Sequence, residues 1–278
     1  MNKPEETVRN FYDTYGWVKK AGGSGEDVLF RRFSPAYYPY HERVNERTLA
    51  LFDGLDGSLL MAGGGDLPET HVAIARRFSQ TTCLDISTLA VEIARQKLDG
   101  SGEFIVGSLL EIPKPDNSFD AAYCAHVIYH IDKDEQERAV RELIRVTIPG
   151  GRVAVIYANP DSLPRRLAVA KERLPGARRF KRQQPAANAE AGQPPPLYFF
   201  VHPLAWWTQF NDSCKVDIKP WDVMGKPAEE ALLVTDRIAS VAYRLCAWIE
   251  RRYPERAVRW WEYPLITLTK KVRGVRAG

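Results

Sequence analysis

The stretch Leu59-Leu60-Met61-Ala62-Gly63-Gly64-Gly65-Asp66 joins a short apolar run to a glycine cluster, and a second run, Thr81-Thr82-Cys83-Leu84-Asp85-Ile86, reaches a carboxylate at its end. A segment of helical pattern separates them, which is typical of a β-strand–helix–β-strand unit with a small-molecule site at its carboxyl edge. The glycines let the backbone turn sharply and let a ligand approach. Asp85, twenty residues after Gly65, lies where a dinucleotide fold places the acid that accepts both ribose hydroxyls. The pattern therefore predicts a nucleoside site.

Many α/β proteins turn from strand to helix on glycine for steric reasons, so the turn alone does not identify a ligand. Asp66 and Glu69 have the spacing of a capping box, and Pro68 suits a first helical turn, where its missing N–H costs nothing. We therefore expect a helix to begin near Leu67 and to end near Phe78.

Composition limits the class of protein. The chain of 278 residues is 45% hydrophobic, enough for one large core with an appended cap. A net charge of +4 with 27% charged residues does not indicate a nucleic-acid binder. The four cysteines form no CxxC pair, which favours free thiols in a reducing compartment. No apolar run approaches the length of a membrane span and no export signal is evident, so we expect a cytoplasmic protein.

Residues 1–57 are predicted to form a helical and aromatic cap. An aromatic face at helical spacing predicts a helix over 5–15. Residues 21–25 read as a glycine-rich loop, and 33–41 as irregular, because a proline disfavours helix in the residue before it. The aromatic residues of 33–41 either touch substrate or pack beneath a lid. A further helix around Val44 to Leu55 leads into the first strand.

From residue 58 to 278 the pattern predicts one domain in which strands and helices alternate. Strands are expected at 59–62, 81–86, 103–106, 119–124 and 152–157, with helices at 69–78, 87–98 and 132–147. Strands that read as continuous apolar runs indicate a parallel sheet covered on both faces. The fold class is therefore α/β, a Rossmann-like, doubly wound, seven-stranded and mostly parallel sheet with an amino-terminal cap.

An insertion follows the fifth strand, at about 160–200. Residues 160–182 carry eight basic side chains against two acidic ones, and 183–196 are rich in Gln, Pro and Ala. We expect a basic helix followed by a linker. The sheet then resumes with a short helix at 203–210, a strand at 214–221, a long helix at 228–251 and a last strand at 265–270. The long helix has an apolar face made by Ile238, Val241, Ala242, Leu245, Trp248 and Ile249.

The order of these motifs resembles the class I S-adenosylmethionine-dependent methyltransferases, in particular the small-molecule group that includes ubiquinone-biosynthesis enzymes. The resemblance covers roughly residues 40 to 160. Residues 59–65 are similar to the first motif of the family, 84–87 to its ribose-binding motif and 107–109 to its adenine-side motif. His126 to Ile131 and Arg145 to Gly151 resemble the later motifs.

The resemblance implies S-adenosylmethionine as the cofactor and a set of residues that hold it. Gly63 and Gly65 would border its methionine part, Asp85 would bind the ribose diol, and Ser108 would lie near the adenine amino group. The full implied cofactor site is Ala62, Gly63, Gly64, Gly65, Asp85, Ile86, Ser108, Leu109 and Ala125, with Ile86 and Leu109 sandwiching the adenine.

Three positions depart from the family pattern: Met61 stands where an acid is usual, Leu67 where a third glycine is common, and Ser108 where aspartate is frequent. The third glycine brings a pyrophosphate close to the helix amino terminus in dinucleotide folds. A sulfonium nucleoside has no phosphate, so Leu67 favours it over a nicotinamide dinucleotide.

His126 and His130 are the candidate catalytic residues. His126 follows the fourth strand, where a neutral imidazole takes a proton from a hydroxyl or amine, or simply packs locally. His130 stands where this family often carries a histidine, in a catalytic or a structural role. Weaker candidates are His41, Tyr12, Tyr15, and His202 beside Trp206 and Trp207. No compact set of metal ligands is evident, so no metal is expected.

These features predict methyl transfer to a hydroxyl or amine of a small metabolite, such as a sugar, secondary metabolite or lipid precursor. The sequence Tyr123-Cys124-Ala125-His126 lacks the Asn-Pro-Pro-aromatic signature of enzymes that methylate amino groups of nucleic-acid bases. Nucleic acid is therefore not the expected partner, and a homodimer is compatible with the pattern. Two alternatives stay open: a non-catalytic methyltransferase-like binding subunit, suggested by Met61 and Ser108, and an RNA-modifying enzyme that uses the basic insertion.

Overall fold

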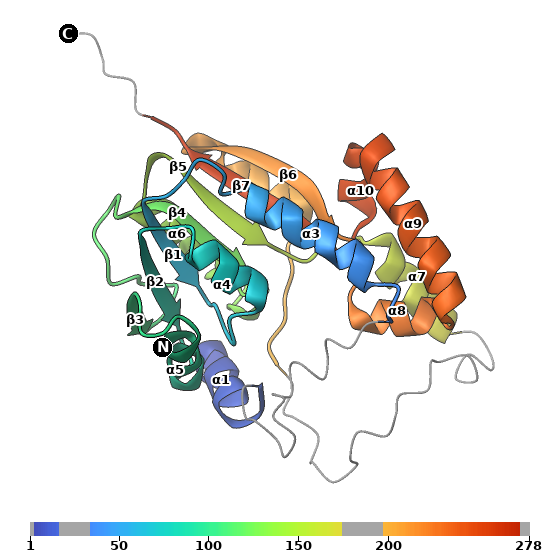
Figure 1. Ribbon diagram of the computed structural model, residues 1–278, viewed down its shortest axis with the longest axis horizontal. Coiled ribbons are helices and arrows are strands. Elements are labelled where there is room, and N and C mark those ends of the chain that lie inside the picture. The colour runs from blue at the N-terminus through green and yellow to red at the C-terminus, as the bar shows by residue number, and fades with distance from the viewer. Residues whose placement is uncertain (1–2, 17–33, 174–196, 273–278) are drawn as a thin grey trace.

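The computed structural model describes residues 3–16, 34–173 and 197–272. Its centre is a seven-stranded sheet in the order β3-β2-β1-β4-β5-β7-β6 (Figure 1). The strands are β1 (Ser58–Ala62), β2 (Gln80–Asp85), β3 (Glu103–Val106), β4 (Phe119–Ala125), β5 (Thr147–Ile156), β6 (Cys214–Asp222) and β7 (Tyr263–Lys270). Neighbouring strands are parallel from β3 to β5, whereas β7 is antiparallel to both β5 and β6. The predicted fold class is confirmed.

The strand order places the carboxyl ends of β1, β2 and β4 side by side. Because β6 is antiparallel to β7 and β7 is antiparallel to β5, β6 runs in the same direction as β5. The carboxyl end of β6, at Asp222, therefore lies at the same edge of the sheet as Asp85 and Ala125. Ligands bind at this edge in open α/β sheets.

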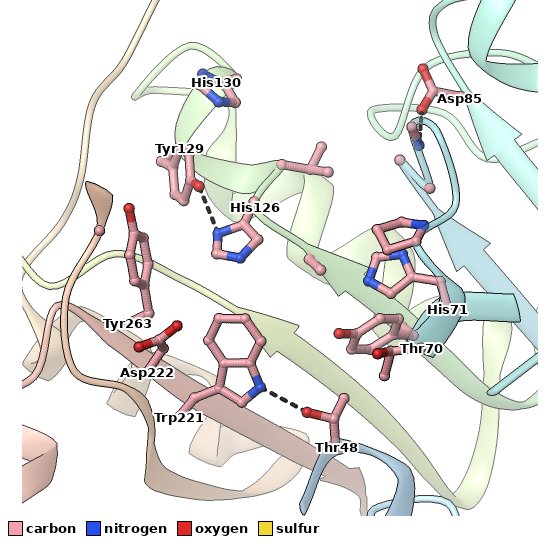
Figure 2. A pocket seen from close by; sticks show the side chains of 18 of the residues that line it. Thr48, Thr70, His71, Asp85, His126, Tyr129, His130, Trp221, Asp222 and Tyr263 are labelled. Carbon is pink, nitrogen blue, oxygen red and sulfur yellow. Dashed lines mark hydrogen bonds between the residues drawn. The ribbon is translucent and has the colours of Figure 1, made fainter. Parts of the chain in front are cut away.

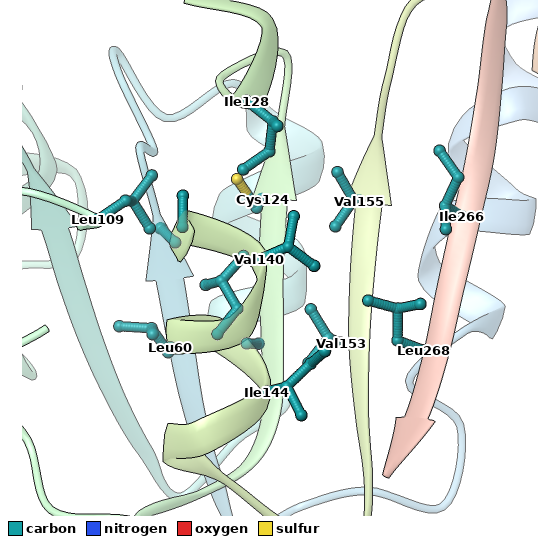
Figure 3. Close-up of a cluster of buried hydrophobic side chains, with 14 of the residues drawn as sticks. Leu60, Leu109, Cys124, Ile128, Val140, Ile144, Val153, Val155, Ile266 and Leu268 are labelled. Atoms are coloured by element: carbon teal, nitrogen blue, oxygen red, sulfur yellow. The ribbon is translucent and has the colours of Figure 1, made fainter. Parts of the chain in front are cut away.

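Alternation along the strands separates two cores. Leu60 of β1 and Val153 of β5 face α6 (Gln136–Val146), whose Val140 and Ile144 pack on them (Figure 3). On the opposite face Leu59 and its neighbours pack against the helices that lie in front of the sheet in Figure 1. These are α3 (Tyr38–Ala50), α4 (Glu69–Ala75) and α5 (Thr88–Lys97). The prediction of helices on both faces is confirmed.

Two helix starts differ from the sequence prediction. The segment 33–41 was expected to be irregular, yet α3 begins at Tyr38, because Pro39 lies in its first turn, where proline is tolerated. The next helix begins at Glu69, as the range 69–78 predicted, and not near Leu67, where the capping box placed it; its N-cap is Pro68 with no side-chain cap hydrogen bond. Leu67 has a φ of 45°, a left-handed conformation that cannot open a helix. The predicted capping box therefore does not form.

Three other element boundaries were wrong. Helix α6 starts at Gln136, not near Asp132, and β5 already includes Pro149-Gly150-Gly151, which was expected to lie outside it; the irregular register of β5 against β4 accommodates this segment. The single helix expected at 228–251 is two helices, α8 (Lys226–Leu232) and α9 (Asp236–Arg252). Thr235 separates them, because its side chain accepts a hydrogen bond from the Ile238 N–H and caps α9.

Helices α7 (Leu163–Glu172), α8, α9 and α10 (Pro254–Trp260) gather at one end of the sheet (Figure 1). Helix α9 packs inward through Ala239, Tyr243 and Ala247, whereas Ile238, Val241, Leu245 and Trp248 of its apolar face are exposed. The expected basic helix of the insertion is α7, and the expected linker at 183–196 lies outside the described residues.

The amino-terminal helix α1 (Lys3–Phe11) and the π turn Tyr12–Gly16 lie beside α5 at the carboxyl edge of β2 and β3 (Figure 1). A short 3-10 helix, η4 (Leu204–Asp212), buries Trp207 and Phe210. The glycine-rich loop expected at 21–25 lies outside the described residues. Within the described part of the chain, no helix is long and apolar enough to cross a bilayer. All four cysteines are free thiols.

Candidate cofactor and acceptor site

A cavity of about 520 Å³ opens at the carboxyl edge of the sheet. Asp85 lies on one side of it, and Trp221, Asp222 and Tyr263 lie on the other, with His126 between (Figure 2). We call the side that contains the glycine turn and Asp85 the nucleoside half, and the side with the aromatic rings the acceptor half. The cavity thus joins the predicted cofactor site to a second chamber.

The glycine turn builds the nucleoside half. Gly63 has a φ of 67°, and its N–H donates to the Leu84 carbonyl at 2.7 Å. A Cβ at Gly63 would lie 2.3 Å from Cγ2 of Val127. Gly65 has a φ of 56°, and its N–H donates to Asp85 Oδ2 at 3.0 Å. Both glycines are therefore required by backbone conformation, and Gly63 also by packing.

Backbone donors hold the Asp85 carboxylate in place. Gly65 N–H binds one oxygen, and Ser87 N–H donates to Oδ1 at 2.9 Å. Ser87 also caps α5, as predicted, by accepting from Ala90 N–H. Burial raises the pKa of Asp85 to about 6; the two backbone hydrogen bonds lower it, and the nearby Asp13 raises it.

The raised pKa of Asp85 predicts that nucleoside binding weakens in acid. A ribose diol donates two hydrogen bonds, which an ionised carboxylate accepts and a protonated one does not. Below the pKa of about 6, the free protein holds a proton that must leave before binding. The dissociation constant of S-adenosylhomocysteine should therefore rise roughly tenfold per pH unit below that value and stay flat above it. Calorimetry across this range measures the dependence, and an affinity that does not change with pH would contradict it.

Seven of the nine implied cofactor residues line the cavity: Gly63, Gly64, Gly65, Asp85, Ile86, Leu109 and Ala125. Ala62 and Ser108 are not among the residues that line it. Ala62 is buried in the core on the α6 face. Ser108 Oγ binds a carboxylate oxygen of Glu5 and accepts from Leu110 N–H at 3.0 Å. Met61 also packs in the core, so its side chain does not reach the cavity.

Glu5 of α1 lines the cavity and binds Ser108, the residue found where the family often has aspartate. It therefore brings a carboxylate to Ser108, the residue that the resemblance implies lies near the adenine amino group. We expect Glu5→Gln to weaken S-adenosylhomocysteine binding about tenfold, because one hydrogen bond to a charged acceptor is lost. Glu6→Gln is the matched control, since Glu6 is the next residue of α1 and is exposed. Equal affinities of the two variants in calorimetry would refute a role for Glu5.

His126 lines the cavity from the end of β4 with a φ of 62°, a strained conformation for a residue other than glycine. Its Nδ1 lies 2.9 Å from the Tyr129 hydroxyl. Its ring meets those of Trp221 and Tyr263 edge to face, with centroids 5.3 and 5.0 Å apart. The imidazole is thus held among the aromatic walls of the acceptor half.

His130 also lines the cavity, and its Nδ1 lies 2.8 Å from the Tyr198 carbonyl oxygen. A carbonyl only accepts, so Nδ1 carries the proton. Burial lowers the pKa of His130 to about 4, so its ring is neutral at physiological pH. This geometry suits a hydrogen-bonding residue better than a strong base.

The weaker catalytic candidates differ in whether they line the cavity. His41 and Tyr12 line the cavity. His202 does not: its ring stacks on Trp206 at 4.6 Å, and its Nε2 lies 3.2 Å from the Lys133 carbonyl oxygen. The suggestion that His202 faces the pocket was therefore wrong. The side chain of Tyr15 lies outside the described part of the chain.

Sequence reasoning missed Trp221, Asp222 and Tyr263, which form much of the acceptor half. Trp221 Nε1 donates to Thr48 Oγ1 at 2.8 Å, which fixes the plane of the indole (Figure 2). The sequence could have indicated Asp222 as a site residue, because it directly follows the strand predicted at 214–221. Only the direction of that strand in the sheet showed that its end meets Asp85 at one edge. No cluster of three or more His, Cys, Asp or Glu side chains in the described residues could hold a metal ion.

Residues 60–155 match the family described as a methyltransferase domain. A ubiquinone/menaquinone biosynthesis C-methyltransferase of Methylobacterium nodulans is 37% identical over 174 residues, which cover 59% of this chain and 61% of the relative. Its counterpart in Brucella suis is 34% identical over 116 residues, 38% of this chain and 41% of the relative. The chain thus spans less than two thirds of the length of these curated relatives.

Solved structures with the same fold cover nearly the whole chain. The N-methyltransferase NodS from Bradyrhizobium japonicum, in complex with S-adenosylhomocysteine, aligns with a TM-score of 0.56 and 11% identity, over 97% of this chain and 99% of its own. Geranyl diphosphate C-methyltransferase from Streptomyces coelicolor aligns with a TM-score of 0.56 and 15% identity, over 97% and 98%. At such identities the likeness concerns the fold alone. The matched segment and the relatives thus show a methyltransferase domain at residues 60–155, and the chain as a whole has the fold of solved methyltransferases.

Proposed function

We propose that the protein transfers the methyl group of S-adenosylmethionine to a hydroxyl or amine of a small metabolite. One observation carries the proposal: a single cavity joins the glycine turn and Asp85 to an aromatic chamber that contains polar side chains. The proposed acceptor is a sugar, a secondary metabolite or a lipid precursor. The names of the relatives, which are C-methyltransferases of quinone biosynthesis, support a small-molecule acceptor.

The residues of the nucleoside half fit this cofactor. Asp85 offers a carboxylate to the ribose, and Ile86 and Leu109 line the same half with apolar side chains suited to the faces of adenine. Leu67 and Pro68 occupy the place of a third glycine, which a ligand without phosphate does not need. When bound, the cofactor supplies a methyl group already activated on a sulfonium.

The protein therefore has to orient the acceptor, exclude water and accept a proton. The aromatic walls and the buried floor of the acceptor half exclude water from the reacting atoms. His126 and Asp222 are among the titratable side chains that line the cavity, together with His41 and Lys226. We propose that residues 1–57 act as a cap on the cavity, since Val8 and Tyr12 line it and Tyr37 and Thr48 contact residues of its acceptor half.

The location and assembly of the protein belong to the same proposal. Its four free thiols favour a reducing compartment, and we propose the cytoplasm. The acceptor reaches the cavity as a free small molecule in this scheme, and self-association as a homodimer is tested by light scattering.

Calorimetry with S-adenosylhomocysteine tests the proposal. We expect one site per chain with micromolar affinity, which is about −8 kcal/mol. A folded sample that shows no heat at millimolar ligand would refute it. Transfer of a labelled methyl group to members of an amine and alcohol panel then identifies the acceptor, and binding without transfer to any acceptor would point to a non-catalytic subunit.

A further inference from the structure

We propose that Asp222 is the acceptor-binding residue and proton acceptor of this site, and that the acceptor it recognises is a primary or secondary amine. The inference rests on the proposed function and adds the chemical class of the acceptor. It is carried by the buried Asp222 side chain, which borders the cavity, by the aromatic rings that border the same half and by the ion pairs that nearby cations make with other carboxylates.

Asp222 ends β6 and is 3% exposed, yet it borders the cavity. One oxygen, Oδ2, accepts a hydrogen bond of 2.5 Å from the Tyr37 hydroxyl. The other, Oδ1, has no hydrogen-bond partner of good geometry, although the backbone N–H groups of Val223 and Met224 lie near the carboxylate and lower its pKa. A buried carboxylate oxygen without a donor is costly, and such groups persist where a ligand completes them. An N–H or O–H of the acceptor would supply the donor.

The charge of Asp222 favours an amine over an alcohol. Among the described residues no cation pairs with it: Arg47 binds Glu250 at 2.9 Å, and Lys226 binds Glu230 at 3.5 Å. Trp221 and Tyr263 border the same chamber, and aromatic rings attract cations. An ammonium group would donate a hydrogen bond to Oδ1 and would also neutralise the charge of the carboxylate. An alcohol would donate the hydrogen bond but would leave the charge in place.

The contacts of Tyr37 determine which carboxylate oxygen of Asp222 is available to the acceptor. Tyr37 is buried, and its hydroxyl lies 2.6 Å from His41 Nδ1 as well as 2.5 Å from Asp222 Oδ2. Since a hydroxyl carries one proton, its bond to Asp222 requires His41 Nδ1–H to donate to the Tyr37 oxygen. Tyr37 and His41 are therefore positioning residues that orient the carboxylate.

The proton and the charge balance along this route. The ammonium of the acceptor gives one N–H proton to Asp222 Oδ1, which leaves a lone pair on nitrogen. The nitrogen forms its bond to the methyl carbon as the carbon–sulfur bond breaks, and that electron pair stays on sulfur. The methylated amine leaves with the positive charge that the sulfonium brought, and Asp222 leaves the step neutral. Burial raises the pKa of Asp222 to about 7, which suits this exchange.

The assignment of Asp222 as the acceptor-binding residue predicts how amine binding depends on pH. Amine binding needs ionised Asp222 and so should strengthen as pH rises through about 7. The Tyr37 hydrogen bond lowers that pKa, so Tyr37→Phe should move the midpoint upward while binding persists. The titratable and charged groups around Asp222 are Tyr37, Tyr40, His41, His126, Glu250, Tyr243, Cys246, Tyr263 and Lys226, and Glu262 lies next to Tyr263.

Benzylamine and benzyl alcohol serve as matched probes, titrated by calorimetry or NMR with and without S-adenosylhomocysteine. We expect the wild type to bind benzylamine at least about tenfold more tightly than benzyl alcohol, as one charge-assisted hydrogen bond provides. Asp222→Asn keeps an acceptor for Tyr37 and should abolish that preference. Asp217→Asn, an exposed change on the same strand, should leave it intact.

The outcomes separate the inference from the proposed function. Equal affinity of Asp222→Asn and wild type for benzylamine, including no measurable binding by either, overturns the inference. A Tyr37→Phe midpoint that does not move overturns the positioning role. S-adenosylhomocysteine binding in the same samples reports on the function alone: its loss in the wild type refutes methyl transfer, whereas its retention by Asp222→Asn shows that the variant is folded.

Discussion

Replacing Asp85 with asparagine should lower the affinity for S-adenosylhomocysteine about 100-fold, which corresponds to roughly 3 kcal/mol for two charge-assisted hydrogen bonds. An amide has one accepting oxygen, and its NH₂ group would face the N–H of either Gly65 or Ser87, which both donate to the carboxylate. The ribose diol would therefore lose at least one acceptor. Calorimetry at neutral pH measures the loss.

Asp99→Asn is the control, because this side chain is 84% exposed and lies at the far end of α5. Its affinity should equal that of the wild type. Thermal unfolding of both variants separates lost binding from lost folding. An Asp85→Asn variant that is folded and binds as tightly as the wild type would show that the ribose does not bind at Asp85. It would therefore refute the assignment of the nucleoside half.

Gly63→Ala should have the largest effect on stability of any single methyl group added to this site. Its Cβ would lie 2.3 Å from Val127 Cγ2 and 3.0 Å from Cγ1, and the φ of 67° is unfavourable for alanine. Overpacking costs about 1–3 kcal/mol and the left-handed conformation about 1–2 kcal/mol. We expect the free energy of unfolding to fall by roughly 2–5 kcal/mol, measured by denaturant titration, together with loss of nucleoside binding.

A double-mutant cycle with Val127→Ala identifies the cause. Removing both Cγ atoms relieves most of the overlap and leaves only the cost of the left-handed φ, so the double variant should recover about half of the lost stability. Val127→Ala alone loses two partly buried methyl groups and reports that cost. Additive effects in the cycle would show that the steric contact with Val127 is not what requires glycine here.

The alternation of strands and helices could be predicted from the sequence because it follows from which side chains are buried. Strands covered on both faces are apolar throughout, as in Val153 to Ile156, and the amphipathic pattern of α6 follows from its one buried face. The local signal also sufficed for the Ser87 cap, where one hydroxyl reaches an N–H three residues ahead. The helix start at Tyr38 was missed, and the capping box expected at Asp66 does not form, because Pro39 and the left-handed Leu67 decide these positions through backbone angles.

The nucleoside half of the site was also largely predictable. Its residues follow strand ends in one continuous segment, so chain order brings Gly63, Asp85 and Leu109 to one edge. Ser108 and Ala62 were placed in it by resemblance, yet Ser108 binds Glu5 and Ala62 is buried in the core. The contribution of Glu5 had no local signal, because α1 reaches the adenine side from more than 100 residues away in sequence.

The sequence by itself determined the parallel sheet and the glycine turn at 63–65, since both depend on local backbone preference and on the period of apolar residues. It also determined the position of Asp85. The tertiary structure alone decided the acceptor half. Tyr37 and Asp222 are 185 positions apart, and only the direction of β6 and the packing of the residues before α3 bring them together. The nucleoside half follows from one stretch of chain, whereas the acceptor half exists only where distant segments meet.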